Sequence, residues 1–411
     1  MEVMHERVAG LDVHKAMIVA CVRIMAEGKI KRECRTFETS TASLEALLDW
    51  LTASRCTHVA MEATGVYWKP VWNILSDGAF ELIVANAAHI KNVPGRKTDV
   101  NDATWIADLV ACGLIRPSFV PGEAIQELRS LLRARKQLSR EQTSHIQRIQ
   151  KTLEEANIKL DSVISDIMGV SGRRMIEAMI AGVRNPHKLA ALADRRIKAS
   201  PKVLYDALHG RLTDHHRFML RLHLEHYEQL EVLQGQFTQR IEEKLAPFAA
   251  EVELLKTIPG IAERTAEVLL AEIGPDLTPF PTANHLASWA GMCPGNNESA
   301  GKRRSGRMRK GNLWLRSALV QMAWAASRTK NTYLSAYFRR LSVRRGRKRA
   351  LIALSHSMLV IIYHVLNRRT PYQDLGATYL DQLAPERLTQ QLVKRLERLG
   401  HKVTLEPQQA A

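Results

Sequence analysis

The hydrophobic pattern of this 411-residue chain changes its period once, near Gly122. Before that point, short apolar runs rich in β-branched residues alternate with stretches in which apolar side chains recur every three or four residues. This alternation predicts strands and helices in turn, and therefore a layered α/β domain. After that point the spacing of three and four continues with little strand signal, so the rest of the chain is predicted to be all-α.

The first part of the chain is predicted to contain three strands, a helix, a strand, a helix, a strand and a final helix, and to end near residue 116. The predicted strands are residues 7–15, 16–24, 31–39, 57–63 and 80–86, and the predicted helices are residues 40–54, residues 66–75 and a run that starts near residue 99.

Two long helices are predicted within residues 117–254, with shorter helices between them. We expect the long helices to pair antiparallel as a helical, coiled-coil arm, with an ordinary bundle as the alternative. The side chains expected to form the two apolar stripes are Leu128, Leu132, Ile146, Ile149, Leu153, Leu230, Leu233, Phe237, Ile241 and Leu245.

A third region, residues 255–375, precedes a tail of mixed charge, residues 376–411. Near its start, Pro259 and Gly260 turn the chain into a helix. The pattern resembles the second half of a helix-hairpin-helix element, in which amide groups at a glycine-containing turn bind phosphate. Gly260 is therefore a candidate nucleic-acid contact, and a plain helical turn is the alternative interpretation.

Positive charge is concentrated in one segment of the chain. From Ser299 to Gln373 there are 18 Lys and Arg and no Asp or Glu, while the net charge of the whole chain is +17. The remainder is therefore close to neutral. A solvated protein surface normally mixes both signs, whereas a segment of one sign attracts a polyanion and binds it in a salt-dependent way. We predict nucleic acid as the partner.

Several other classes of protein are disfavoured. The five cysteines contain no CxxC pair, which predicts neither a zinc site nor a disulfide framework and suits a reducing cytoplasm. No secretory signal opens the chain. Residues 350–366 are apolar but short for a membrane span, so we expect a buried core helix and no membrane partner. Five tryptophans are expected in hydrophobic cores, with base-stacking platforms as the alternative: Trp68, Trp105, Trp289, Trp314 and Trp324.

Four acidic residues of the α/β part occupy positions where a charge is unusual: within or at the end of an apolar strand, or as a close pair at the start of a helix. Asp12 interrupts an apolar strand, and Glu62 ends a buried strand before a glycine-containing loop. Asp99 and Asp102 are three residues apart at the start of a predicted helix, so they share a face. Carboxylates this close repel one another unless a cation lies between them. Their hard oxygen ligands suit Mg²⁺, in a one-metal or two-metal site for phosphoryl chemistry, with Mn²⁺ as an alternative.

Three sequence blocks carry these acids: "GLDVHK", "MEATGVYW" and "GRKTDVNDA". They resemble the DEDD motif in the RuvC-like, RNase H-fold domain of transposases of the insertion sequence 110 family. The later block "LASWAGMCPGNNESAGKRRSGRMRKGNLWLRSAL" is similar to the family's second conserved block and is closest to the 1111 subgroup. The resemblance implies an RNase H-like domain in residues 1–116, a helical linker in residues 117–254 and a C-terminal transposase domain in residues 255–375.

The resemblance also implies that a C-terminal serine attacks DNA phosphate and forms a covalent phosphoserine intermediate. By its position in the block this is Ser299, and Ser305 is the rival candidate. From the residues alone, Ser299 is either a turn serine or a nucleophile assisted by nearby cations. The residues expected to bind nucleic acid are Lys302, Arg303, Arg304, Arg307, Arg309, Lys310, Arg316 and Gly260.

A Mg²⁺-dependent DNA transposase or recombinase follows from this resemblance, acting on donor and target DNA under the guidance of a structured RNA that the element encodes. Because strand exchange needs paired active sites, we expect a homo-oligomer, a dimer or tetramer, in the bacterial cytoplasm at the nucleoid. Two alternatives stay open: a hydrolytic nuclease of the junction-resolving kind, in which Ser299 is structural, and a non-catalytic nucleic-acid-binding derivative.

Overall fold

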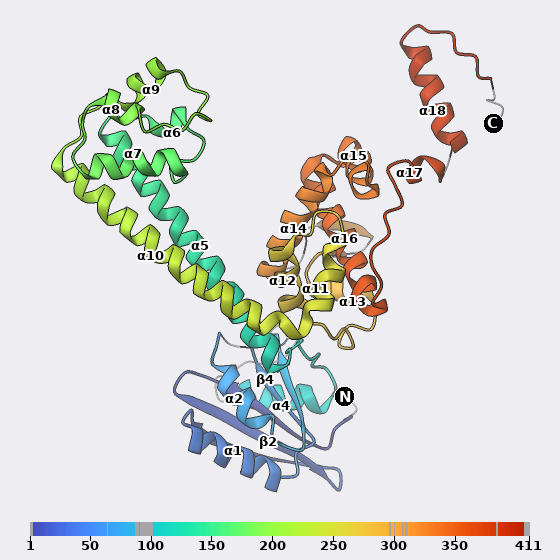
Figure 1. The fold of residues 1–411 in the computed structure, drawn as a ribbon. Coiled ribbons are helices and arrows are strands. Elements are labelled where there is room, and N and C mark those ends of the chain that lie inside the picture. Colours follow the sequence, from blue (N-terminus) through green and yellow to red (C-terminus); the bar gives the residue numbers. More distant parts are fainter. Residues whose placement is uncertain are drawn as a thin grey trace. The chain divides into compact units, whose positions relative to one another are not determined.

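The computed structural model in Figure 1 describes residues 3–63, 65–86, 90, 102–295, 297–299, 301–305, 308, 311–383 and 385–406, with the backbone alone for residues 297–299, 303–305 and 387. The chain divides into two compact units, Met1–Pro121 and Gly122–Ala411. The first unit is α/β, and the described part of the second is helical apart from one short hairpin. An α/β part followed by a helical part is what the sequence predicts.

The first unit is built on a five-stranded sheet in the order β3-β2-β1-β4-β5. The first three strands pair antiparallel, whereas β4 runs parallel to β1, and β5 runs parallel to β4. Parallel neighbours need a crossover, and α2 (Trp68–Leu75) connects β4 to β5. The strands are β1 (Arg7–Val13), β2 (Met17–Ala26), β3 (Lys29–Glu38), β4 (His58–Glu62) and β5 (Glu81–Ala85), and α1 (Thr41–Ala53) joins β3 to β4.

Each face of this sheet has its own hydrophobic core. Leu11 of β1 packs with Leu47 of α1 on one face, in a core that also includes α2. On the other face, Val8 of β1 packs with Ile106 of α4 (Asp102–Ala111). Successive strand residues point to opposite faces. The even-numbered residues of β1 therefore face α4.

Two long helices begin the second unit, α5 (Glu123–Glu155) and α10 (Asp214–Leu245). The two helices run antiparallel (Figure 1). Two contacts show this: Lys244 near the end of α10 pairs with Glu127 near the start of α5, and further along Gln234 Nε2 donates to Gln142 Oε1 at 2.9 Å. Shorter helices at the far end enclose a separate core, as expected. They are α6 (Leu160–Val163), α7 (Val170–Ile180), α8 (Pro186–Ala190) and α9 (Pro201–Leu208).

The predicted apolar stripe holds along most of α5 and fails at one position of α10. Leu128 and Ile149 are fully buried, and Ile241 is buried on α10. Leu233, in contrast, is 41% exposed, so its predicted burial was wrong. Gln142 and Gln234 meet at this level of the helix pair, and two helices without a third layer can bury only a narrow strip.

The remainder of the second unit is a helical bundle around α16 (Arg347–Arg368). Leu354, Met358 and Leu359 of α16 are fully buried. Among the helices that the structure describes, α16 alone is long and apolar enough to cross a membrane, and half of its most apolar stretch is buried inside the protein. This agrees with the expected core helix. The other elements are η2 (Ala246–Phe248), α11 (Ala249–Lys256), α12 (Glu263–Ile273), α13 (Ala283–Trp289), β6 (Asn297–Ser299), β7 (Lys302–Ser305), α14 (Leu313–Arg328), α15 (Tyr333–Arg345), α17 (Tyr379–Gln382) and α18 (Pro385–Arg398).

Candidate active site

Asp12 lies one residue before the carboxyl end of β1, the central strand of the sheet. Its side chain is 20% exposed, and His14 Nε2 lies 3.0 Å from its Oδ2 atom. A charge is disfavoured inside a central strand, but in open sheets with parallel strands the strand ends are where binding sites form. The position of Asp12 therefore fits a site residue better than a structural one.

Glu62 lies beside Asp12 in the neighbouring strand. The parallel register pairs Leu11 with Met61, so one further step along both strands brings Asp12 and Glu62 together. Glu62 ends β4, is partly buried and is opposite Ala85 of β5. Paired residues on neighbouring parallel strands point to the same face. Both carboxylates are thus on the α4 face, at the same end of the sheet.

A glycine allows α4 to approach β1 directly. A Cβ atom at Gly10 would lie 2.2 Å from Ala103 O and 2.4 Å from Ala107 N, well inside van der Waals contact. Only a residue without a side chain permits this approach. Gly10 is two residues before Asp12 on the same face, and Ala103 follows Asp102. The contact therefore brings the first turn of α4 to the part of the sheet that carries Asp12.

Asp102 is the first residue of α4 and is partly buried. The amino end of a helix stabilises a negative charge. Three of the four predicted acids, Asp12, Glu62 and Asp102, thus share one face, and Asp99 lies outside the described residues. Within the described ranges, no three His, Cys, Asp or Glu side chains lie close enough to hold a metal ion. The four-acid metal site stays a prediction.

Two arginines that sequence reasoning missed fix the other end of α4. Arg23 Nε on β2 and Arg32 Nη2 on β3 each donate to Asp108 Oδ1 at 2.9 Å. Arg23 and Arg32 are directly opposite in the sheet, where like charges repel unless an anion lies between them. The sequence does show Arg23 inside the apolar run of β2, which indicates a buried charge. It does not show the partner of Arg23, because Asp108 is 85 residues away.

Cys21 on this face is buried and is not activated as a nucleophile. Cys21 and Cys34 are opposite each other on β2 and β3, and Thr104 Oγ1 of α4 lies 3.4 Å from Cys21 Sγ. Burial, followed by the hydrogen bond with Cys34, raises the pKa of Cys21 to about 12. Its thiol is therefore protonated at neutral pH and lacks the thiolate that reacts.

Ser299 lies in a short hairpin of the second unit, next to the turn. It ends β6 and is opposite Lys302 of β7. Gly301 in the turn has a φ of +73°, in the left-handed region that favours glycine. Ser305 is at the open end of the hairpin, opposite Asn297. The segment around Ser299 is therefore partly strand, and the two candidate serines differ in position: Ser299 is next to the turn, whereas Ser305 is at the open end.

The predicted nucleic-acid contacts are only partly described. Lys302 is exposed beside the hairpin turn, and Arg316 is partly buried in α14. The backbone of Arg303 and Arg304 runs along β7. The residues outside the described ranges are Arg307, Arg309 and Lys310. Binding of nucleic acid by this set stays a prediction.

Gly260 has a clear packing role. It lies in the turn between α11 and α12 with a φ of +90°, and a Cβ atom there would lie 2.6 Å from Met322 O and from Ala326 N of α14. Its lack of a side chain lets the turn contact the backbone of α14. This packing explains the glycine without a ligand, and its predicted contact with phosphate is untested.

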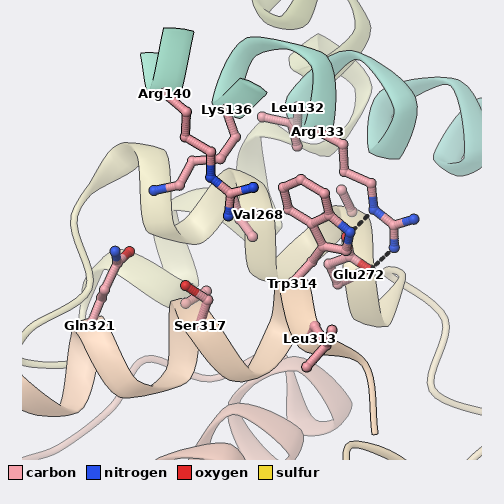
Figure 2. Close-up of a pocket in the computed structure, with 12 residues that line it drawn as sticks. Leu132, Arg133, Lys136, Arg140, Val268, Glu272, Leu313, Trp314, Ser317 and Gln321 are labelled. Atoms are coloured by element: carbon pink, nitrogen blue, oxygen red, sulfur yellow. Dashed lines mark hydrogen bonds and ion pairs between the residues drawn. The ribbon is translucent and has the colours of Figure 1, made fainter. Parts of the chain in front are cut away.

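Ion pairs between α5 and α12, which sequence reasoning also missed, form the base of the arm. Arg133 donates twice to Glu272, from Nε to Oε1 at 2.9 Å and from Nη2 to Oε2 at 2.8 Å (Figure 2). The Glu272 side chain is 2% exposed and also accepts from Asn312 Nδ2 at 2.6 Å. Arg135 pairs with buried Glu267 one turn away. Glu267 and Glu272, which stand among the apolar residues in the second half of α12, were the signal in the sequence.

Two family models match this chain. Residues 9–158 match a transposase model described as DEDD_Tnp_IS110, and residues 252–339 match the model of the Transposase IS116/IS110/IS902 family. The first match includes the four acids, and the second includes the hairpin with Ser299.

Curated relatives and a solved structure are also similar. The chain is 25% identical, over 292 residues, to the "Transposase for insertion sequence element IS1111A" of Coxiella burnetii, covering 69% of this chain and 71% of that protein. It is 32% identical over 150 residues to the "Insertion element IS110 uncharacterized 43.6 kDa protein" of Streptomyces coelicolor, covering 36% of this chain and 35% of that protein. The RuvC structure of Thermus thermophilus aligns with 27% of this chain and 99% of its own at 16% identity, with a TM-score of 0.22.

Proposed function

Because this chain belongs to the IS116/IS110/IS902 family of transposases, we propose that it cuts and rejoins DNA strands of an insertion sequence of the 1111 subgroup. The acids of the first unit and Ser299 of the second would form one active site, within a protomer or between two. We further assign the first unit to the RNase H fold. The sheet order and the packing of α4 over the acidic face support this assignment.

The acidic face is proposed to hold one or two divalent cations, Mg²⁺ or Mn²⁺. The observation that carries this proposal is the side-chain-free contact at Gly10, which brings the helix of Asp102 onto the strand of Asp12. Asp12, Glu62 and Asp102 offer only carboxylate oxygens, the ligands that these ions prefer. A bound cation would polarise the phosphate oxygens of the DNA. His14, in contact with Asp12, would orient that carboxylate.

Ser299 is proposed as the nucleophile. Its hydroxyl oxygen would bond to phosphorus while the bond from phosphorus to one deoxyribose oxygen breaks. The serine proton passes to a base, and the departing sugar oxygen gains a proton. One phosphodiester linkage replaces another, so the broken strand can be rejoined without an external energy source. The position of Ser299 beside exposed Lys302 supports this role, since a cation there would stabilise charge on the transferring phosphoryl group.

We infer that the partners are donor and target DNA, a structured guide RNA and further copies of the same chain. The support is the segment from Ser299 to Gln373, with 18 basic and no acidic residues. Base pairing by an RNA would supply sequence recognition, and the protein would bind backbone and shape. A bacterial cytoplasmic location at the nucleoid follows from this proposed role.

The decisive experiment separates metal binding from covalent chemistry. Asp12→Asn, Ser299→Ala and Ser305→Ala proteins are compared with wild type for Mn²⁺ binding by electron paramagnetic resonance and for protein-linked DNA on a suicide substrate. Asp12→Asn is expected to weaken Mn²⁺ binding by more than the roughly 10–100-fold cost of losing an outer-shell partner. Ser299→Ala is expected to bind Mn²⁺ normally and form no adduct, while Ser305→Ala still forms one.

Other outcomes favour the alternatives. Cleavage by Ser299→Ala at the wild-type rate, without protein-linked DNA in any variant, would identify a hydrolytic nuclease. Normal DNA binding with neither cleavage nor Mn²⁺ binding in wild type would identify a non-catalytic derivative.

A further inference from the structure

A pocket of about 220 Å³ lies in the second unit where α5, α12 and α14 meet (Figure 2). Its floor is apolar, with Leu132 of α5 and Val268 of α12. Trp314 forms one wall, and Ser317 and Gln321 of the same helix provide polar groups. The volume is below the roughly 300–1,000 Å³ of pockets for drug-sized ligands, so it suits a single ring system.

Trp314 is held in this pocket by the end of its own helix. Asn312 Oδ1 accepts from Trp314 N at 3.0 Å and from Leu315 N at 3.2 Å, which caps α14, while Asn312 Nδ2 donates to buried Glu272. The indole ring is partly exposed, and the guanidinium carbons of Arg133 and Arg140 each lie 5.4 Å from its centroid. The start of α14 is therefore tied to α12, and the Trp314 side chain lines the pocket.

The basic side chains around the Trp314 ring differ in whether they pair with a carboxylate. Arg133 is bound by Glu272. Lys136 and Arg140, one and two turns further along α5, are exposed and form no ion pair with any residue that the structure describes. Nearer the start of α5, Arg129, Arg133 and Arg135 all meet glutamates of α12. Within the described ranges, two positive charges beside the aromatic pocket are thus not neutralised by a carboxylate, and one of them, Arg140, also lies over the ring.

We propose that this pocket binds an unpaired nucleotide of a nucleic acid, with its base against Trp314 and its phosphate at Lys136 and Arg140. The site deepens the proposed function and rests on it. Bases stack on aromatic rings when they leave a duplex, and arginine and lysine bind the adjoining phosphate. Ser317 and Gln321 offer donors and acceptors to the base edge. A pocket of this size beside an aromatic ring favours a nucleotide, whose base can stack on Trp314. An acidic peptide would use only the positive charges and would leave the aromatic ring without a role.

Trp324 provides a matched control on the same helix. It has a similar contact, with the guanidinium carbon of Arg328 4.4 Å from its ring centroid, and its side chain is 39% exposed. It does not line the pocket. A general effect of removing an arginine-stacked tryptophan from the basic segment would appear in both variants, whereas a pocket-specific effect would appear only at Trp314.

The test measures binding of the full chain to four fluorescein-labelled probes by anisotropy: oligodeoxythymidine, oligouridine, an abasic strand of equal length and a blunt duplex. Trp314→Leu is expected to weaken binding of at least one base-containing single strand about five- to a hundredfold, with the abasic strand and the duplex unchanged. The two single strands distinguish DNA from RNA. Trp314→Phe keeps a ring and should restore most of the affinity. Arg140→Gln should weaken all single strands, including the abasic one.

Several results would overturn the proposal. They are wild-type affinity of Trp314→Leu for both base-containing strands, an equal loss on all four probes, and an equal loss in Trp324→Leu. If wild type binds none of the probes, both this site and the proposed function fail. If wild type binds them and Trp314→Leu is unchanged, the pocket alone fails. Circular dichroism and thermal melting of Trp314→Phe and Trp314→Leu verify that the fold is intact.

Discussion

The two units fix their key helices by opposite means. In the first unit, α4 contacts β1 where Gly10 has no side chain, so the contact is set by shape. In the second, α5 contacts α12 through Arg133 and Glu272, so the contact is set by charge and hydrogen bonds in a site where Glu272 is 2% exposed. A shape-based contact fails when atoms are added, and a charge-based contact fails when a partner is removed.

The largest effect is expected from Glu272→Ala. Removing a buried partner leaves its cations uncompensated, which costs about 3–5 kcal/mol, and the lower end applies here because Arg133 is 35% exposed. Chemical denaturation should show the loss for the second unit, and Arg133→Ala combined with Glu272→Ala should cost less than the sum of the two. Additive losses would mean that the pair is not coupled.

Gly10→Ala should have a smaller effect on stability and a more specific one on the acidic face. Overpacking of a tight contact costs about 1–3 kcal/mol, occasionally more. Because the added methyl group would meet backbone atoms of α4, the helix must move away from β1. As the helix moves away, the affinity for Mn²⁺ should fall. The free energy of unfolding of the second unit, measured without DNA, should stay unchanged. Unchanged metal affinity in a correctly folded Gly10→Ala protein would contradict the role given to this contact.

A third type of contact lies further along α5, where it meets α10 through histidine rings. His145 stacks on His226 with 5.0 Å between ring centroids and meets His223 edge-on at 5.4 Å. Burial is the main cause that lowers the pKa of His145 and of His223 from the usual 6.5, and the positive charge of Arg148 adds to it. The Nδ1 atoms of both rings are buried without a hydrogen-bond partner in the described structure.

These lowered pKa values predict that the arm weakens in mild acid. The unfolded arm takes up protons at the ordinary pKa of 6.5, whereas the folded arm resists protonation. The stabilisation is therefore complete above that pH and is lost as the pH falls through it toward the folded-state values. Hydrogen exchange of α5 and α10 peptides, corrected for intrinsic rates, should speed up between about pH 7 and pH 5. His145→Leu with His223→Leu should abolish this trend, and a trend that persists would exclude these histidines.

The periodicity of the sequence predicts most of the fold. Residues 7–15 and 57–63 carry strand signals and contain β1 and β4, and the long helices α5 and α10 appear where apolar spacing changes. Local patterns suffice there because each element buries one face. The prediction for Leu233 was wrong because the exposure of this residue depends on how many helices surround the arm. The spacing of apolar residues along one helix does not specify that number.

The candidate site is predicted less completely. Asp12, Glu62 and Asp102 are conspicuous as charges at strand or helix ends, and the structure brings these three to one face. The steric reason, Gly10 against Ala103, is invisible to any pattern because the two residues are far apart in the chain. Trp314 was expected in a core and instead lines a pocket between α5, α12 and α14, and the meeting of three helices distant in the chain cannot be read from spacing along one helix.

The contact at Gly10 has a mechanical consequence for the acidic face. Because Gly10 has no side chain, no flexible side chain separates the backbones of β1 and α4 at this point, so we expect the two elements to move together. The contact thereby couples the position of β1, which carries Asp12, to that of the first turn of α4. A change that separates β1 from α4 is therefore expected to move Asp12 and Asp102 apart together with the backbones that carry them.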